Sequence, residues 1–247
     1  MSLAASPTMS AAEWQARCEL AALYRVSEHL GWTDLVNTHI SARIPDEPDT
    51  FLINHYGELF EEITPASLVK MDMRGNVIGD SRRFNKAGFA IHSGVLLARP
   101  DANFVLHTHT RAGMAASLLP NGLRPISQDV LHVYDDLAYH AYGMPSTQEE
   151  CDALGETCRL GSCVVLHNHG LLTFGRNVHG TMLRMYKLDR ACDVEVLSRS
   201  LGVAPVEVDA ALVPQIGAKM RRWRDGDEYG RAEWQALLRK IGWRPDT

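Results

Sequence analysis

The chain has 247 residues, of which 45% are hydrophobic and 22% charged, so its composition is that of an ordinary globular protein. Its formal net charge of −5 at pH 7, without any basic run, argues against nucleic acid as the main partner. Apolar stretches fall well short of the roughly 18 residues that a membrane-spanning helix needs, and the N-terminus has neither the charged start nor the apolar core of a secretory signal. We therefore expect a cytoplasmic protein that binds neither nucleic acid nor membranes.

The length suits one large domain, which we expect over residues 10–247 behind a disordered tail at residues 1–9. The five cysteines are odd in number and include no C-x-x-C pair. This pattern favours buried thiols in a reducing compartment over a disulfide framework or a zinc cage of thiolates.

The first part of the chain predicts one helix followed by short extended segments. From Ala11 onward, apolar residues recur every three or four positions, and Gly31 stands where such a helix would end. The other predicted elements here are extended segments at 38–44 and 50–54 joined by a turn at 45–49, a short helix opened by Thr64 and Pro65, and a hairpin of 69–73 with 77–78 that turns at Gly75 and Asn76.

The rest of the chain alternates helices with two buried strands. The predicted elements are a helix at Lys86–Ala98, a strand at Asn103–His109, a strand at Cys163–His167, a long amphipathic helix at Val178–Leu197 and a final helix at about Arg231–Lys240. Helices on both sides of a central, mostly antiparallel sheet make a layered α/β domain.

Histidines stand at the ends of both buried strands. His107 and His109 are two residues apart, so in a strand their imidazoles project from the same face. His169 follows the second strand, within the sequence Asn-His-Gly, and comes within reach if the two strands are neighbours. These three histidines are candidate ligands of one metal ion, and the alternative is a hydrogen-bonded cluster in the core.

Three imidazoles with a fourth position open are typical of catalytic metal sites rather than structural ones. We expect one divalent ion per subunit. Nitrogen ligands suit zinc best, but iron, manganese, cobalt and nickel remain open because spacing alone does not choose among them.

The sequence resembles the class II aldolase/adducin family over about Ala11–Trp243. The segments that carry the resemblance are Thr38–Arg43 (THISAR), Phe51–Gly57 (FLINHYG), Ala98–Ala102 (ARPDA), His107–Thr110 (HTHT) and Asn168–Leu172 (NHGLL). Two further segments, Lys86–Ser93 and Glu233–Leu238, look like the adducin-type bacterial branch of that family, which lies apart from the sugar-phosphate aldolases.

The resemblance implies a three-layer α/β/α domain with a nine-stranded, largely antiparallel sheet. It also implies a homotetramer of cyclic symmetry, with active sites between neighbouring subunits that process a small molecule. The family's metal ligands fall on His107, His109 and His169.

The sequence departs from the aldolases at their acid/base positions. In the aldolases a Ser-Ser-Glu sequence begins the helix before the His-x-His strand; the serines hold the substrate phosphate and the glutamate moves a proton. These positions are Lys86, Ala87 and Gly88 here. The aldolase tyrosine that protonates from the neighbouring subunit falls on Gln128, whose amide cannot replace a phenol.

A metal-dependent lyase fits these departures best. Its substrate would be small, carboxylated and non-phosphorylated, and the reaction would be decarboxylation or retro-aldol cleavage. Arg111 would bind the carboxylate if the strand of His109 continued that far. His92, one helical turn after Gly88, is a candidate proton donor. Further candidates are Tyr134 as a second donor and His55 and Gln128 as substrate-binding residues.

Two other functions remain open at this point. Some relatives on this fold are thought to use a three-histidine centre as a mononuclear non-haem iron oxygenase. Adducin-type heads keep similar histidine strings, so a non-catalytic assembly module is also compatible with the motifs.

Overall fold

A seven-stranded sheet runs through the computed structural model, which describes residues 9–79, 83–144 and 146–245. Its strand order is β3-β2-β1-β4-β7-β6-β5, and all neighbours are antiparallel except β5 and β6. The strands are β1 (His39–Ile44), β2 (Glu47–Ile53), β3 (Val69–Asp72), β4 (Phe104–Thr108), β5 (Leu137–His140), β6 (Cys163–Leu166) and β7 (Gly170–Gly175). The predicted largely antiparallel sheet is confirmed, although the described residues form seven strands rather than nine.

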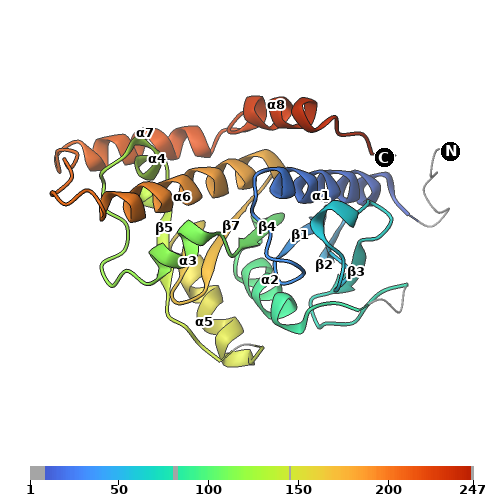
Figure 1. The fold of residues 1–247 in the computed structure, drawn as a ribbon. Coiled ribbons are helices and arrows are strands. Elements are labelled where there is room, and N and C mark those ends of the chain that lie inside the picture. The colour runs from blue at the N-terminus through green and yellow to red at the C-terminus, as the bar shows by residue number, and fades with distance from the viewer. Residues whose placement is uncertain (1–8, 80–82, 145, 246–247) are drawn as a thin grey trace.

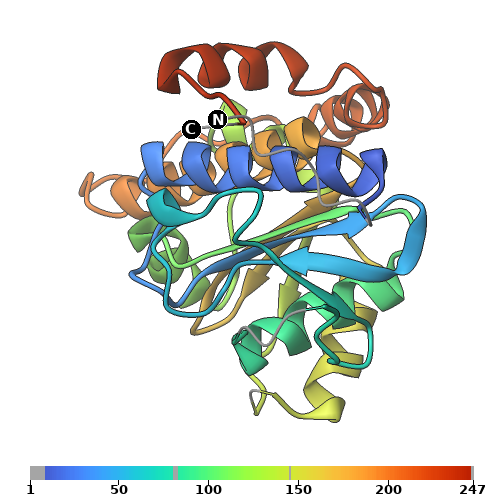
Figure 2. The ribbon, with the colours of Figure 1, turned by 90° about the vertical axis from the view of Figure 1, so that its right-hand side faces the viewer.

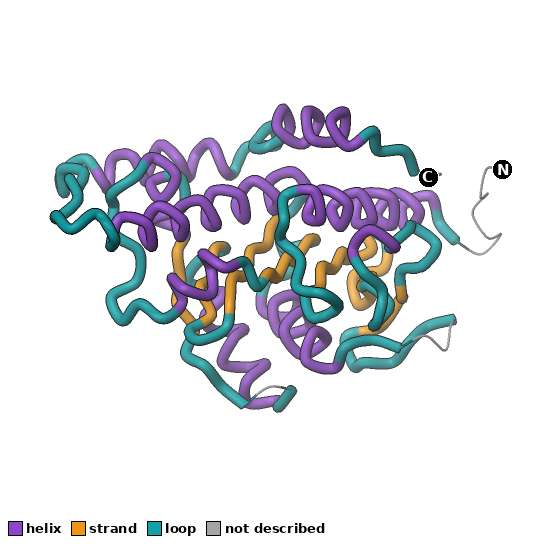
Figure 3. The backbone as a smooth tube through the Cα atoms, viewed as in Figure 1, coloured by secondary structure: helices purple, strands orange, loops and turns teal. Residues whose placement is uncertain are grey.

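Helices cover both faces of this sheet (Figures 1 and 2). One face carries α1 (Ala11–His29) and α6 (Val178–Ser198), and the other carries α2 (Lys86–Ala98) and α5 (Gln148–Cys158). Outside α1 and α6 lie α7 (Val213–Arg224) and α8 (Arg231–Ile241); the short helical elements are α3 (Arg111–Ser117), α4 (Gln128–Leu131), η1 (Phe60–Glu62) and η2 (Tyr134–Asp136). The predicted α/β/α layering is thus confirmed, and Figure 3 shows the strands as a layer between helices.

Alternation along β4 decides which layer each of its side chains faces. Phe104 and Leu106 belong to the core cluster under α1 and α6, whereas Val105 belongs to the cluster under α2 and α5. His107 follows Val105 by two residues, so its imidazole faces the α2 layer. The sheet therefore presents the candidate metal ligands on the side covered by only two helices.

Most of the predicted elements exist, with two errors in the first part of the chain. Thr64 and Pro65 open a single turn rather than a helix, and the Thr64 hydroxyl accepts a hydrogen bond from the Ser67 backbone N–H at 3.2 Å. Strand β3 begins at Val69, which leaves no room for a longer helical segment. The predicted turn at 45–49 is also too long, because Glu47 already pairs with Ile44.

Eight elements were not predicted: the strands β5 and β7, the helices α3, α4, α5 and α7, and the short elements η1 and η2. Strand β5 and helix α4 have only four residues each, too few to show a period. All five cysteines are buried and free, as expected. None of the helices in the described ranges is long and apolar enough to span a membrane. The predicted disordered tail lies outside the described residues, apart from Met9.

Helix α1 is tied to β1 by the buried hydroxyl of Tyr24. This hydroxyl accepts a hydrogen bond from the Ile40 N–H at 2.8 Å, and it lies 2.5 Å from the Ile40 carbonyl and 2.9 Å from the Asn54 side-chain oxygen. Ile40 is adjacent to His39, so the contact also fixes the strand next to the histidine cluster.

We expect Tyr24→Phe to lower the free energy of unfolding by about 1–3 kcal/mol, because it leaves a buried backbone N–H unpaired without changing core volume. Denaturant unfolding measures the change. Tyr56→Phe, at a ring that is 42% exposed, is the control and should have little effect. Equal losses in the two variants would contradict the assigned role of the buried hydroxyl.

Candidate metal centre

His107 stands near the end of β4, opposite His39 on β1 and Leu172 on β7. It is fully buried, and its Nδ1–H donates a hydrogen bond to the Leu171 carbonyl at 2.9 Å. Burial, followed by the nearby imidazoles of other histidines, lowers the pKa of His107 well below its ordinary value. The ring is therefore neutral, and the unprotonated Nε2 carries a lone pair.

His109 lies just beyond the end of β4 and is oriented by an acidic residue. Its Nδ1 lies 2.9 Å from Oδ2 of Asp34, in the loop after α1. A hydrogen bond from Nδ1 to this carboxylate orients the ring, so that Nε2 points toward His107. This Nε2 lies 2.9 Å from the Nε2 of His107.

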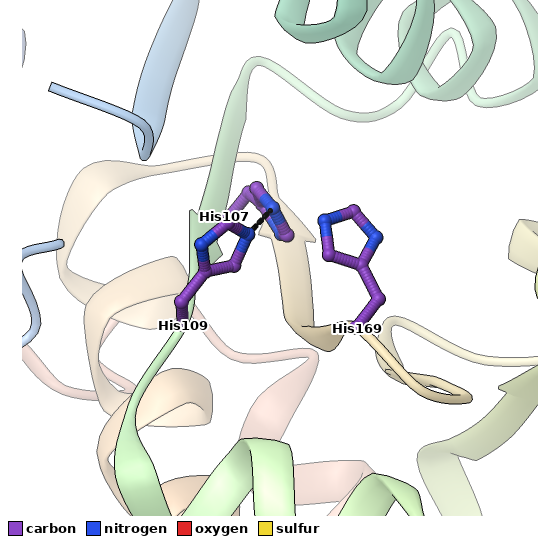
Figure 4. A group of neighbouring side chains, drawn as sticks. All are labelled: His107, His109 and His169. Atoms are coloured by element: carbon purple, nitrogen blue, oxygen red, sulfur yellow. Dashed lines mark hydrogen bonds between the residues drawn. The ribbon is translucent and has the colours of Figure 1, made fainter. Parts of the chain in front are cut away.

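His169 reaches the same point from the turn between β6 and β7 (Figure 4). Its ring centroid lies 4.7 Å from that of His107 and 4.9 Å from that of His109. The turn fits because Gly170 has no side chain: a Cβ there would lie 2.4 Å from the Thr108 carbonyl oxygen and 3.1 Å from the His109 ring. Burial, then the charge of His109, lowers the pKa of His169 to about 4.

The structure therefore brings together the three histidines that the sequence selected. One ring nitrogen from each lies within 4.8 Å of the others. Because Nδ1 of both His107 and His109 is engaged elsewhere, their Nε2 atoms face each other, and this arrangement suits a shared cation. Zinc–nitrogen bonds of about 2.0–2.1 Å in a tetrahedral site place the nitrogens roughly 3.3 Å apart. The 2.9 Å separation needs only a small adjustment, so the triad fits a divalent metal ion.

The carboxylate of Asp34 orients His109, so its loss should weaken metal binding. Such supporting residues typically contribute about 10- to 100-fold in affinity. Because the Asp34 side chain is 41% exposed, we expect Asp34→Ala to weaken zinc binding by about tenfold, the lower end of that range.

Competition with a chromophoric zinc chelator measures this change. Asp46→Asn, on an exposed turn, serves as the control. An unchanged dissociation constant in Asp34→Ala would show that the hydrogen bond does not orient a metal ligand.

His92 does not face a cavity. It is fully buried, and its ring nitrogens lie 2.8 Å from Nδ1 of His39 and 2.5 Å from the hydroxyl of Ser41. Burial, then the charge of His107, lowers its pKa to about 3. With both nitrogens engaged inside the protein, a role for His92 as a direct proton donor does not fit the structure.

The other predicted site residues lie around the centre rather than in it. Arg111 begins helix α3, so the expectation that it continues the strand face of His109 is wrong; its exposed guanidinium pairs with no described residue. Nδ1 of His55 lies 3.6 Å from Oε1 of Glu58. Gln128 is exposed at the start of α4, and Tyr134 packs against the core cluster of α1 and α6. Within the described parts of one subunit, neither of these two contacts the triad.

A small cavity of about 150 Å³ adjoins His169. Its walls are mainly apolar and come from α2, α5 and the segment between β5 and α5; they include Ala87, Ala90, Ile91, Tyr142 and Leu154. The sequence did not reveal this cavity, because its walls are distant from one another along the chain. Asp34 and His39 were missed for the same reason: each reaches the centre from a separate segment.

Comparisons with known proteins agree with this architecture. Residues 18–196 match the model of the class II aldolase and adducin N-terminal domain. A Pseudomonas aeruginosa protein named "Putative aldolase class 2 protein" is 44% identical over 94% of this chain and 91% of its own length. Mouse α-adducin is 34% identical over 91% of this chain, which corresponds to 32% of the adducin.

Solved structures show the same fold. An aldolase II superfamily protein from Pseudomonas syringae has a TM-score of 0.89 and 37% identity, with 95% of this chain and 94% of the other covered. L-fuculose 1-phosphate aldolase from Glaciozyma antarctica has a TM-score of 0.81 and 26% identity, with 96% and 95% covered. With a family model over more than half of its length and relatives this similar, the chain belongs to the class II aldolase and adducin family.

Proposed function

We propose that this chain is a metal-dependent lyase that cleaves a C–C bond in a small, carboxylated, non-phosphorylated substrate, by decarboxylation or retro-aldol cleavage. The observation that carries the proposal is the histidine triad: His107 and His109 each engage Nδ1, so that both Nε2 atoms face a common point. One nitrogen from each of three imidazoles lies within 4.8 Å of the others, and this convergence is typical of a metal site with three histidine ligands.

The ion, of which zinc is the best match to imidazole ligands, supplies a Lewis acid for the negative charge that develops when the bond breaks. The chain itself supplies the orientation of the three imidazoles and a wall of apolar side chains that keeps water from one side of the site. Gly88 offers no acid/base group. Decarboxylation suits such a site, because it needs a charge-stabilising centre and a late proton rather than a base to begin.

The cavity next to His169 supports a substrate with a small apolar part. A cavity of about 150 Å³ with mainly apolar walls accommodates a group of the size of benzene. Ala87 contributes a methyl group to this wall, at a position where the aldolases have a phosphate-binding serine. The guanidinium of Arg111, two residues after His109, pairs with no residue in the described part of the chain and is available to bind a carboxylate.

We further propose a homotetramer in which a neighbouring subunit covers the centre. Tyr142, whose ring lies 6.4 Å from that of His169, is 61% exposed, and Met144 beside it is 73% exposed. Large apolar side chains exposed at the mouth of a site are typical of surfaces that another chain covers. Light scattering should report the tetramer; a monomer at micromolar concentration would contradict both the assembly and the shared site.

The similarity to α-adducin supports one alternative, an assembly module without catalysis. Such a module would have no need for bound metal, so metal content distinguishes it from the lyase. Iron in the purified protein, together with consumption of O₂, would instead favour the oxygenase.

The direct test is CO₂ release and aldehyde release from a panel of hydroxy acids and aromatic acids. The zinc-loaded wild type should turn over at least one of them, and a His107→Ala/His109→Ala variant should turn over none. If neither product appears with any acid while metal is bound, the lyase proposal fails.

A further inference from the structure

The imidazole of His39 occupies the space above Gly88. A Cβ built on Gly88 would lie 2.7 Å from Cδ2 and 2.9 Å from Nε2 of His39. No side chain fits at position 88 while His39 remains in place, so a ring from β1 fills the space into which a helical side chain would extend. The same ring lies 5.0 Å from the ring of His107, between centroids.

His39 ends a chain of buried hydrogen bonds. Its Nδ1 lies 2.8 Å from Nε2 of His92, and Nδ1 of His92 lies 2.5 Å from the hydroxyl of Ser41. All three residues are almost completely buried. The other nitrogen of His39, Nε2, forms no hydrogen bond with any described residue.

The two directions of this chain leave the unpaired hydrogen at opposite ends, either on Nε2 of His39 beside the histidine triad or on the fully buried hydroxyl of Ser41. If the Ser41 hydroxyl donates to His92, then His92 donates from Nε2 to His39, and the single proton of His39 is on Nε2. In the opposite direction the Ser41 hydrogen would have no acceptor among the described residues, and an unpaired buried donor is costly. Burial, followed by neighbouring histidines, also keeps the pKa of His39 well below its ordinary value, so the ring is neutral and carries one N–H.

We infer that His39 is a substrate-binding residue of the proposed lyase, which donates a hydrogen bond from Nε2 to a substrate oxygen beside the histidine triad, with Ser41 and His92 as positioning residues. The identity of the ligand in this inference rests on the proposed function. The tautomer of His39 is independent of that function. A neutral donor aimed at an oxygen that gains negative charge stabilises that charge without moving a proton. Ser41 and His92 act only through the tautomer of His39.

The tautomer can be measured in the metal-free protein without any substrate. Long-range ¹H–¹⁵N correlation spectra of protein with ¹⁵N-labelled histidine distinguish a protonated Nε2 from a protonated Nδ1, and His39→Gln identifies the signals of His39. We expect the proton of His39 on Nε2. Ser41→Ala should shift it toward a mixture with Nδ1, and Ser41→Thr, which keeps the hydroxyl, should restore it. A proton on Nδ1 of His39 in the wild type would overturn the inference.

The binding role is tested with oxalate as the probe and calorimetry on zinc-loaded protein. A hydrogen bond to a charged group corresponds to about 10- to 100-fold in affinity, so His39→Ala should weaken oxalate binding by that factor. His39→Gln, whose amide nitrogen can approach the Nε2 position, should recover most of the loss. His29→Gln, at an exposed histidine on α1, is the control.

The possible outcomes separate the two proposals. Equal oxalate affinity in wild type and His39→Ala, at equal zinc content, overturns the role of His39 and leaves the metal centre intact. A wild type that binds no zinc overturns the lyase, and the substrate role of His39 with it, whatever its tautomer. Zinc binding with a proton on Nε2 and weaker oxalate binding in His39→Ala supports both.

Discussion

Protein purified without chelator should contain about one divalent metal ion per subunit, and the His107→Ala/His109→Ala variant should contain almost none. The double substitution removes two of three nitrogen ligands and leaves His169 alone on a turn. Even supporting residues around such ligands change affinity by about 10- to 100-fold, so the loss of two ligands should exceed this range. Elemental analysis of the two proteins measures the effect.

His167 provides the matched control for this experiment. It stands two residues before His169, as His107 stands two before His109, but its Nδ1–H donates to the Ser117 carbonyl and its ring stacks on Tyr139. His167→Ala should therefore keep its metal. Equal metal content in the wild type and the double variant would end the metal hypothesis.

The histidine triad could be predicted because each part of it is local in sequence. The two-residue spacing of His107 and His109 follows from strand alternation, and an apolar strand leads directly to His169. What the sequence could not show is that β4 and β7 are neighbours, while β6 lies one strand further away. The short turn from β6 into β7 places His169 next to the end of β4.

The failed predictions share a physical cause. His92 was selected by helical spacing from Gly88, and the structure does place it on the inner side of α2. The space in front of it, however, is filled by His39 from β1, which depends on the register of β1 against β4. Arg111 was assigned by continuing a strand that ends at Thr108. Long-range pairing and the end of a strand are set by tertiary contacts, which local patterns do not contain.

Sugar phosphates should not be useful substrates, although the fold matches that of L-fuculose 1-phosphate aldolase from Glaciozyma antarctica. A shared fold does not carry a reaction whose proton-transferring groups are missing. Gly88 has no side chain, and Gln128 has an amide where a phenol is needed. General acid and base groups typically contribute about 10²–10⁴-fold each, so only background rates should remain.

Phosphate recognition should be lost as well. Lys86 and Ala87 replace two serine hydroxyls, and Lys86 is exposed, so the phosphate would gain at most one solvent-screened ammonium. An aldehyde-release assay with fuculose- and ribulose-type phosphates and the metal-loaded protein tests the prediction. Turnover near one per second, abolished by His92→Ala, would show that the reaction had been misjudged while the metal centre was correct.

Substitution of Gly88 by glutamate should not restore aldolase activity, because the ring of His39 occupies the space that the new side chain needs. In Gly88→Glu the new Cβ would lie 2.7 Å from the ring of His39, so the single variant should unfold at a lower temperature than the wild type and cleave no sugar phosphate. In Gly88→Glu/His39→Ala the ring is gone and the side chain has room, so the double variant should unfold at a higher temperature than Gly88→Glu, with His39→Ala as the reference for the hydrogen bond to His92 that is lost. If stability recovers but cleavage does not, the steric conflict with His39 explains the instability of Gly88→Glu, and the missing tyrosine and serines explain the absence of cleavage. If Gly88→Glu alone were as stable as the wild type, His39 would not occupy that space, and the absence of the acid/base group would need a different explanation.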